Sequence, residues 1–369
     1  MNNFKVAPAS IQRAIVAKIE ALFTDLDKGI ADIKTAQAQL KVYRQAVLKK
    51  AFEGELTKQW REQQTDLPTA EQLLAQIKAE RQQHYEQQLI DWRKAVSEWV
   101  KNGKEGKKPT GIKKLIEFKK TEELNLLPNS WCTTNLNYIG FWTGGGTPSK
   151  SNDLFWENGS VLWVTSKDMK AKEITNSQNK ITPESILQSS AKWIKENSIL
   201  VVLRSGILRR ILPVAINRVR CTVNQDLQAL TPFTVNPAYI YWFLVANEFH
   251  IRHKCAKDGT TVESIEVNSL KNYLFPFSSK EEQNQIVREI ESRLSVCDKL
   301  EQTIIESLEK AQALRQSILK KAFEGALLSE TEIAACKAEK DYEPAAVLLK
   351  KIELEKNELA TTKTEKLKK

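Results

Sequence analysis

Leu48-Lys-Lys-Ala-Phe-Glu-Gly54 recurs unchanged as Leu319-Lys-Lys-Ala-Phe-Glu-Gly325, 271 positions further along the chain. The two heptapeptides close a longer repeat, in which residues 4–56 align with residues 275–327 without a gap and 19 of 53 positions are identical. Average residue frequencies give roughly three identities by chance, so the segment is a duplication. A weaker similarity follows each copy, at Leu73-Leu74 and Ile77 against Leu348-Leu349 and Ile352.

Both copies of the repeat have the hydrophobic spacing of a long helix. In the first copy, apolar residues recur at alternating steps of four and three: Ile15, Ile19, Leu22, Leu26, Ile33, Leu40 and Val47. The full set of these positions in the first copy is 15, 19, 22, 26, 29, 33, 36, 40, 43 and 47, and their equivalents in the second copy include Ile286, Ile290, Cys297, Leu300, Ile304, Leu314 and Ile318. This spacing on a charged helix predicts a coiled coil, and Gly54 and Gly325 mark helix ends. If the chain leaves along one helix and returns along the other, the two pair antiparallel. The simplest interpretation is that the helices are structural spacers, in which the length matters and the individual side chains do not.

The region between the repeats changes character near residue 127. Residues 57–126 are polar, with a helix expected over 70–100 and a flexible basic linker over 101–120. Strand-like runs then appear at Val161–Val164, Ile199–Leu203 and Val214–Ile216, and Asn236-Pro begins a helix.

The sequence therefore predicts an α+β fold, with one mixed α/β domain flanked by two long helices that pair as an antiparallel coiled coil. The expected segments are a first long helix (1–56), a helical and basic linker region (57–126), the mixed domain (127–278), a second long helix (279–328) and a helical or disordered lysine-rich tail (329–369).

The charge balance favours an anionic partner. The 369 residues carry 56 Lys and Arg against 46 Asp and Glu, a net charge of +10. Nucleic acid is the first expectation and a membrane surface the second. Five widely spaced cysteines without metal-ligand spacing indicate free thiols in a reducing compartment. Since the sequence has no signal-like segment and no apolar run long enough to span a membrane, a cytoplasmic protein is expected.

No motif carries convincing catalytic or cofactor chemistry. Gly144–Ser151 approaches a phosphate loop, but Ser149 replaces the required glycine and Pro148 stiffens the turn. Asn236-Pro-Ala-Tyr239 resembles the amino-methyltransferase signature but lacks its second proline, and a helix cap explains it better. His250 and His253 lack a third metal ligand. We therefore assign no catalytic residue, no cofactor and no metal to this chain.

Loops that follow predicted strands hold the basic and hydroxyl side chains expected of a DNA-binding surface. Arginine reads guanine edges, whereas lysine and small hydroxyl residues contact phosphates. Each cation alone is equally well explained as solvated surface, but as a group they favour DNA. The candidates are Thr147, Ser149, Lys150, Lys167, Lys170, Lys172, Arg204, Arg209, Arg210, Lys257, Thr260 and Thr261.

Several short elements together resemble the specificity subunit of bacterial type I restriction–modification enzymes. The resemblance covers nearly the whole chain. The matching elements are Leu127-Pro-x-x-Trp131, Gly144-Gly-Gly-Thr-Pro-Ser149, Trp163-Val164 with Asp168, Asn224-Gln-Asp226, Glu281-Glu-Gln283 with Ile286-Val287, and the helix end Arg315–Gly325. One departure is the segment 204–213, which looks longer and more basic than the usual short Arg-Gly turn and puts the base contacts in doubt.

The resemblance implies that 127–278 is a target recognition domain that reads half of a split site in double-stranded DNA. It also implies that the helices set the distance between half-sites and dock methyltransferase subunits. S-adenosylmethionine would then belong to those subunits, and ATP and Mg to a further restriction and translocase subunit. Family members usually have two recognition domains. The register of the repeat predicts that one is missing here, so that a copy of this chain or another chain supplies the second half.

Two other functions stay open at this point. The chain could be a coiled-coil adaptor whose central domain binds protein, or an enzyme in its own right. Charge reversal at Arg204, Arg209 and Arg210 separates the first from DNA recognition, and S-adenosylmethionine binding by the isolated chain would indicate the second.

Overall fold

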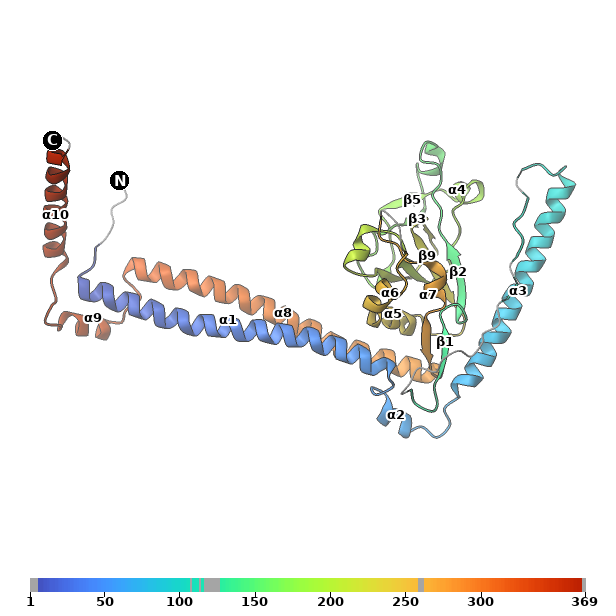
Figure 1. Cartoon of the computed structure of the whole chain (residues 1–369), viewed down its shortest axis with the longest axis horizontal. Coiled ribbons are helices and arrows are strands. Elements are labelled where there is room, and N and C mark those ends of the chain that lie inside the picture. Colours follow the sequence, from blue (N-terminus) through green and yellow to red (C-terminus); the bar gives the residue numbers. More distant parts are fainter. Residues whose placement is uncertain (1–5, 107, 113, 116–126, 258–261, 367–369) are drawn as a thin grey trace. The chain divides into compact units, whose positions relative to one another are not determined.

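The computed structural model describes residues 6–106, 108–112, 114–115, 127–257 and 262–366 (Figure 1). The chain divides into two compact units. The helical unit comprises the chain up to Tyr43 and from Val296 onward, and the mixed unit runs from Arg44 to Ser295. Two long helices, α1 (Ala9–Phe52) and α8 (Lys280–Glu324), contribute to both units. The predicted α+β class, with one mixed domain between two long helices, is confirmed.

The other elements all follow α1 in the chain. The helices are α2 (Lys58–Glu62), α3 (Ala70–Lys101), α4 (Pro183–Gln188), α5 (Pro237–Ala246), α6 (Glu248–Lys254), α7 (Val267–Lys271), α9 (Glu330–Lys337) and α10 (Ala345–Lys366), with 3₁₀ turns η1 (Asp153–Phe155) and η2 (Gly206–Arg209). The strands are β1 (Cys132–Asn135), β2 (Gly140–Gly144), β3 (Val161–Val164), β4 (Glu173–Ile174), β5 (Asn179–Ile181), β6 (Ile199–Val202), β7 (Val214–Asn217), β8 (Thr222–Val223), β9 (Leu227–Pro232) and β10 (Leu274–Phe277).

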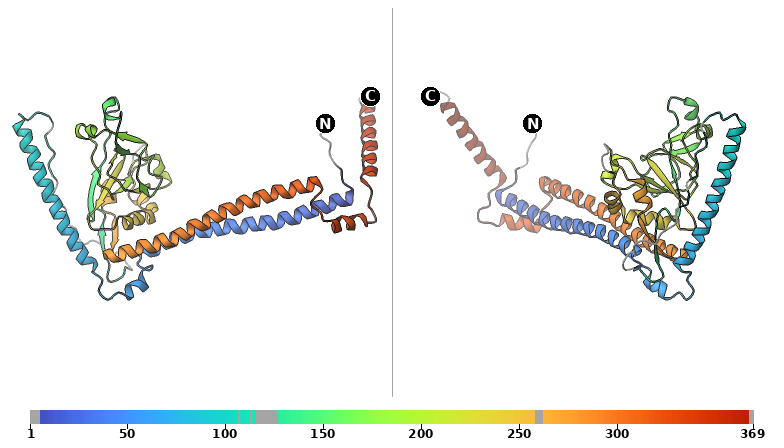
Figure 2. Two further views of the ribbon diagram at one scale, coloured as in Figure 1. Left: turned by 180° about the vertical axis from the view of Figure 1, so that it is seen from behind. Right: turned by 45° about the vertical axis from the view of Figure 1, so that its right-hand side comes forward.

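In the helical unit, α1 and α8 lie side by side and run antiparallel, as both views of Figure 2 show. Arg315 of α8 forms an ion pair with Asp27 of α1, and its guanidinium lies 4.7 Å from the ring centroid of Phe23. The seam between the helices is half-buried, as expected of a two-helix contact open to solvent on its sides.

Two predicted seam positions are wrong. Leu300 is 49% exposed and Leu314 is 52% exposed, so neither packs between the helices. Near the end of each repeat the seam runs instead through Arg315 and its equivalent Arg44, which are half-buried. A straight α-helix has 3.6 residues per turn, so a seam drawn at a strict 3.5 spacing drifts off the contact face within a few turns.

Glycine ends both long helices, as the sequence predicts. Gly54 follows α1 with φ +79°, and Gly325 follows α8 with φ +77°. This left-handed conformation closes a helix at little cost only for glycine. At Gly54 a side chain would also meet Pro128, because a Cβ added there would lie 2.4 Å from the Pro128 Cγ.

Helix α9 and the turn that follows it are bound to the start of α1 by ion pairs within the helical unit. Lys18 binds Glu332 at 2.6 Å, and Arg13 binds both Glu339 and Asp341 at 2.8 Å. The Lys18 ammonium, together with the N–H of Ser329, lowers the pKa of Glu332 to about 2. Ser329 caps α9 and accepts a hydrogen bond from the Glu332 backbone.

The mixed unit is built around a five-stranded sheet in the order β2-β9-β6-β7-β4. A three-stranded sheet, β5-β3-β8, and a two-stranded one, β1-β10, accompany it. The strand runs predicted at Val161–Val164, Ile199–Leu203 and Val214–Ile216 form β3, β6 and β7. The predicted cap is also confirmed, because the Asn236 side chain accepts a hydrogen bond from the Ala238 N–H at the start of α5.

Side chains of the five-stranded sheet are buried on both of its faces. Along β6, Ile199 and Val201 join the core cluster that contains the α5 side chains, whereas Leu200 and Val202 join the cluster that contains Val164 of β3. Because neighbouring residues of a strand point to opposite faces, the apolar run of β6 packs against a helical layer on one face and against a second sheet on the other.

The ends of the long helices belong to the same core as the sheet. Phe52 of α1, Ile77 of α3 and Ile286 of α8 are all buried there, at 8%, 0% and 0% exposure. The carboxylate of Glu282 in α8 is also buried, and it accepts hydrogen bonds from Arg61 and Trp131, each at 2.8 Å. The compact unit therefore extends on both sides of the 127–278 segment.

Candidate nucleic-acid interface

Strand register brings several loops to one edge of the mixed unit. Gly144 at the end of β2 pairs with Gln228 at the start of β9, and Val202 at the end of β6 pairs with Leu227. Val164 and Val223 end the parallel strands β3 and β8 side by side. The segments that meet there, together called the loop edge below, are 144–150, 165–170, 203–213, 224–228, 255–257 and 262–267. Most of the predicted candidates lie on these segments.

The glycine-rich turn packs directly against the segment after β8. A Cβ on Gly145 would lie 1.8 Å from the backbone oxygen of Asn224, so only glycine fits. Gly146 N donates a hydrogen bond to Val223 O at 2.9 Å, and Thr147 Oγ1 donates one to Gln225 Oε1. The turn thus serves close packing at the loop edge and leads from a strand into an extended segment, unlike a phosphate loop, which opens a helix.

Ser149 and Lys150 extend from the same turn into solvent. The Ser149 hydroxyl lies 2.9 Å from that of Ser151, and its backbone oxygen accepts a hydrogen bond from the Trp156 indole at 2.9 Å. The backbone is therefore held in place while both polar side chains stay accessible.

Asp168 organises the turn after β3. Its carboxylate accepts hydrogen bonds from the backbone and hydroxyl of Thr165 at 2.8 and 2.9 Å, and from the Gln178 N–H at 2.7 Å. Lys167 and Lys170 flank it with exposed side chains. The carboxylate holds the turn, and the two ammonium groups remain at the surface.

Lys172 lies away from the loop edge. Its ammonium forms an ion pair with Glu291 of α8 and lies 5.2 Å from the ring centroid of Trp242 in α5. The Trp242 indole donates a further hydrogen bond to Glu291 at 3.4 Å. Lys172 thus joins the sheet to two helices, and its role as a DNA contact stays a prediction.

Helix α6 fixes the loop that follows β6. Arg252 donates hydrogen bonds to the backbone oxygens of Leu208 and Arg209 at 3.2 and 3.3 Å, and Glu248 accepts one from Leu212 N at 2.9 Å. Arg204, Arg209 and Arg210 are exposed on this loop. Arg209 forms an ion pair with Glu263 at 3.2 Å, and both side chains are half or more exposed, so that pair is weak.

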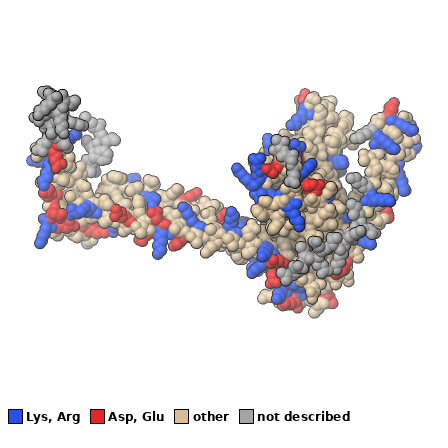
Figure 3. All heavy atoms as spheres, viewed as in Figure 1, with Lys and Arg blue, Asp and Glu red and all other residues tan. Residues whose placement is uncertain are grey.

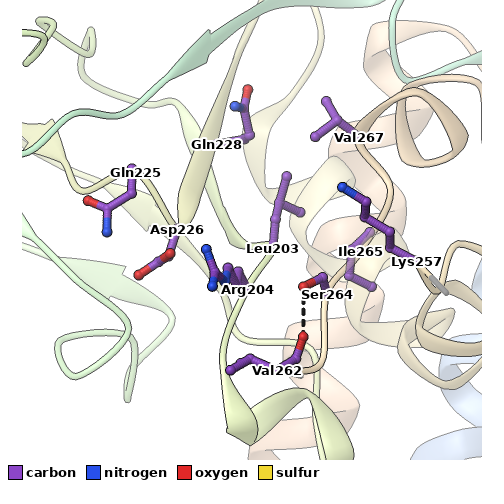
Figure 4. A pocket seen from close by; sticks show the side chains of 10 residues that line it. All are labelled: Leu203, Arg204, Gln225, Asp226, Gln228, Lys257, Val262, Ser264, Ile265 and Val267. Atoms are coloured by element: carbon purple, nitrogen blue, oxygen red, sulfur yellow. Dashed lines mark hydrogen bonds between the residues drawn. The ribbon is translucent and has the colours of Figure 1, made fainter. Parts of the chain in front are cut away.

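A pocket of about 410 Å³ opens at the loop edge (Figure 4). Polar and apolar side chains share its lining: Leu203, Arg204, Gln225, Asp226, Gln228, Lys257, Val262, Ser264, Ile265 and Val267. Within the part of the chain that the structure describes, the side chains of Arg204 and Gln228 have no hydrogen-bond or ion-pair partner. Both are therefore available to a ligand.

Sequence reasoning found the cations of this pocket but missed its amides and its carboxylate. Arg204 and Lys257 were candidates, whereas Gln225, Asp226 and Gln228 were not. Asn224-Gln-Asp226 carried part of the family resemblance, and its place directly before a strand was the available signal. Thr260 and Thr261 lie outside the described residues.

The loop edge carries an excess of cations over carboxylates. Lys and Arg side chains gather on the upper left of the mixed unit in Figure 3. A positive surface around a polar pocket attracts a polyanion and leaves groups for specific contacts.

Side chains of the metal-binding types are dispersed among the described residues. No three side chains of the metal-binding types cluster there, and the His253 ring packs against Phe249 with centroids 4.1 Å apart. None of the five cysteines forms a disulfide, and burial raises the pKa of Cys221 to about 12, which keeps that thiol protonated at neutral pH. Among the helices of the described residues, none is long and apolar enough to cross a membrane.

The chain is similar to a known family of proteins. Residues 128–310 match the family model described as type I restriction modification DNA specificity domain. The chain is 38% identical over 203 residues to the EcoR124I/EcoR124II specificity subunit of Escherichia coli, covering 55% of this chain and 47% of that protein. It is 25% identical over 363 residues to the E. coli EcoBI specificity subunit, covering 95% and 63%.

A solved structure titled for the complex assembly and conformational transition of the type I R-M system has a related fold. Its chain aligns with a TM-score of 0.54 at 18% identity, over 86% of this chain and 60% of that one. The present chain thus spans about half to less than two thirds of the length of these relatives.

Proposed function

This chain belongs to the family of type I restriction–modification DNA specificity domains, and on that premise we propose that it reads one half of a split site in double-stranded DNA. The observation that supports this most directly is the loop edge, where strand register gathers exposed cations around a polar pocket. Cations on the rim bind phosphates and position the duplex, while pocket side chains contact base edges.

Salt dependence tests the phosphate contacts. Each contact releases condensed counterions, so the logarithm of the affinity falls with that of the salt concentration by about 0.9 per contact. Binding of the full chain to duplex DNA should therefore weaken steeply as salt rises. Affinity that does not change with salt would contradict a DNA interface at the loop edge.

Charge reversal locates the interface. Arg204→Glu, Arg209→Glu and Arg210→Glu together should abolish DNA binding and leave helix-mediated assembly intact. A matched variant reverses three exposed cations of α3, Arg93, Lys94 and Lys101, outside the loop edge, and should bind DNA nearly as well. If both triple variants bind equally, the loop edge is not the interface, and the adaptor function gains support.

We also propose that the chain acts without chemistry of its own and docks methyltransferase subunits along its long helices. The names of its relatives as specificity subunits of type I restriction enzymes support this division of labour. S-adenosylmethionine would then bind the methyltransferase subunits, and ATP and Mg a restriction and translocase subunit, with the assembly working in the cytoplasm. Calorimetry of the isolated chain with S-adenosylmethionine should show no binding heat; saturable binding would point to an enzyme.

A second recognition domain, carried by another copy of this chain or by a separate chain, is a further part of the proposal. Identical residues of the two repeats differ in burial: Phe52 is 8% exposed and Phe323 80%, while Val287 is 8% exposed and Val16 52%. In the mixed unit these side chains pack against the recognition domain. Their equivalents in the helical unit, Phe323 and Val16, are exposed instead, and this contrast supports a partner domain at that end of the repeat.

Sedimentation of the full chain tests this surface. Phe323→Asp with Val16→Asp should abolish assembly with the second domain and leave the melting of the mixed unit unchanged. Assembly that persists in this variant would refute the proposed surface. If the second domain comes from an identical copy, the selected DNA site should be a split palindrome, because the two-fold relation of the protein carries over to its site.

A further inference from the structure

We infer that the pocket at the loop edge binds the major-groove edge of purine bases, with Gln228 reading adenine and Arg204 reading guanine. This rests on the proposed function and deepens it, because it assigns base contacts to named side chains. Neither Gln228 nor Asp226 was among the sequence-based candidates.

The frame of the pocket is held by backbone hydrogen bonds. Leu203 N donates to Asp226 O at 2.8 Å, and Ile265 N donates to Leu203 O at 2.8 Å. On the far side, Lys257 N donates to Ser264 O at 2.9 Å. Three segments distant in sequence are thereby fixed to one another, and pocket side chains project from backbone that is already ordered. Such preorganisation lets a side chain discriminate between bases without first losing loop entropy.

Gln228 stands on a strand position that is paired on both sides. It lies in β9 directly opposite Gly144 of β2, and a Cβ at Gly144 would lie 3.0 Å from its amide nitrogen. The glycine therefore leaves room for the amide beside the pocket. The amide oxygen of its neighbour Gln225, by contrast, already accepts a hydrogen bond from the Thr147 hydroxyl. Among the glutamines of the pocket, Gln228 is thus the one with both polar atoms available in the described structure.

A carboxylate beside Arg204 favours a base over a phosphate at that point of the pocket. Asp226 lines the pocket beside Arg204, and its carboxylate accepts one hydrogen bond from Asn224 at 3.0 Å. A carboxylate repels phosphate but tolerates a neutral base edge with an amino group. Glutamine pairs with N6 and N7 of adenine, and arginine with O6 and N7 of guanine, both through two hydrogen bonds. Valines 262 and 267 provide apolar wall beside them.

Selection from a pool of random-sequence duplexes, using the full chain, tests the inference. A two-bond contact discriminates between bases by roughly 5- to 150-fold. Gln228→Glu keeps the side-chain shape but accepts hydrogen bonds only, so preference at one position should move from adenine to cytosine. Gln228→Met keeps the length without polar atoms, and should lose the adenine preference without gaining another. Arg204→Ala should weaken the preference for guanine at a different position of the selected DNA site.

Two matched controls lie outside the pocket. Gln188→Glu, on α4, and Arg218→Ala, whose guanidinium pairs with Glu173, should leave the selected sequence unchanged. If the unaltered chain enriches no sequence, the proposed function fails. If it selects a site and the Gln228→Glu and Gln228→Met chains, both folded by their melting curves, select the same one, only the pocket inference is overturned.

Discussion

Replacing Phe52 and Phe323 by alanine in separate variants gives an unusually controlled measurement of burial. The two residues occupy the same position of identical heptapeptides in helices of nearly equal length, so differences in intrinsic helix propensity largely cancel. Phe52 is 8% exposed, and its ring centroid lies 5.2 Å from that of Tyr239 and 5.4 Å from that of Phe243. Phe323 is 80% exposed.

The expected magnitudes follow from that contrast. Truncating a buried phenylalanine costs about 3–5 kcal/mol, through lost transfer free energy and the cavity that remains. At about 2–4 °C per kcal/mol for a unit of this size, Phe52→Ala should lower the melting temperature of the mixed unit by roughly 6–20 °C. Phe323→Ala should change stability by under about 0.5 kcal/mol, as is usual for a surface position.

Differential scanning calorimetry of the full chain is the assay. The mixed-unit transition should move only in Phe52→Ala. Equal shifts in the two variants, or a larger one for Phe323→Ala, would refute the claim that one copy of the repeat is packed against the recognition domain and the other is not. Binding of the proposed second recognition domain should be weakened more by Phe323→Ala than by Phe52→Ala. That comparison connects the stability measurement to assembly.

Three further outcomes are expected. Arg252→Ala should weaken DNA binding roughly 5- to 30-fold, since two hydrogen bonds to the 205–212 loop, at about 0.5–1 kcal/mol each, are lost. Hydrogen exchange at the Leu212 amide should become faster in this variant, and unchanged exchange would contradict a positioning role for Arg252. Burial lowers the pKa of His84 below 6.5. Because the unfolded chain then binds the proton more readily than the folded chain, the mixed unit should lose stability as pH falls through about 6.5. His84→Gln should remove part of that loss of stability in thermal melts. Gly145→Ala should destabilise the mixed unit by about 1–3 kcal/mol in denaturant titration, because its Cβ would lie 1.8 Å from the Asn224 oxygen; a neutral substitution would show that the turn does not pack as described.

Local sequence predicted the elements well where one physical rule dominated. The repeats gave both long helices and their glycine ends, and β-branched runs gave β3, β6 and β7. The rule failed at Leu300 and Leu314, where the 3.6-residue turn of a straight helix moves a strict heptad position off the seam. A seam position therefore depends on the supercoil as well as on the spacing, and short stretches of sequence do not specify the supercoil.

In the candidate site, too, the residues recognisable by type were predicted, and those placed by tertiary packing were not. Cations in loops after strands were predicted because arginine and lysine are recognisable by residue type, and Lys172 shows the limit, since only tertiary packing places Glu291 beside it. Gln228 carries no such signal. Its place in the pocket depends on pairing with Gly144, some 84 positions earlier, and on the backbone bonds of Leu203.

Phe52 and Phe323 show the limit of local sequence most directly. A method that uses only local sequence must assign them the same environment, because their heptapeptides are identical, and yet one is buried and the other exposed. What differs is whether a recognition domain packs on the helix end. The duplication repeats the residues that pack on the mixed unit, and the chain between the repeats covers Phe52 but leaves Phe323 exposed. The second recognition domain proposed above would cover the exposed copy, where Phe323 and Val16 lie in solvent.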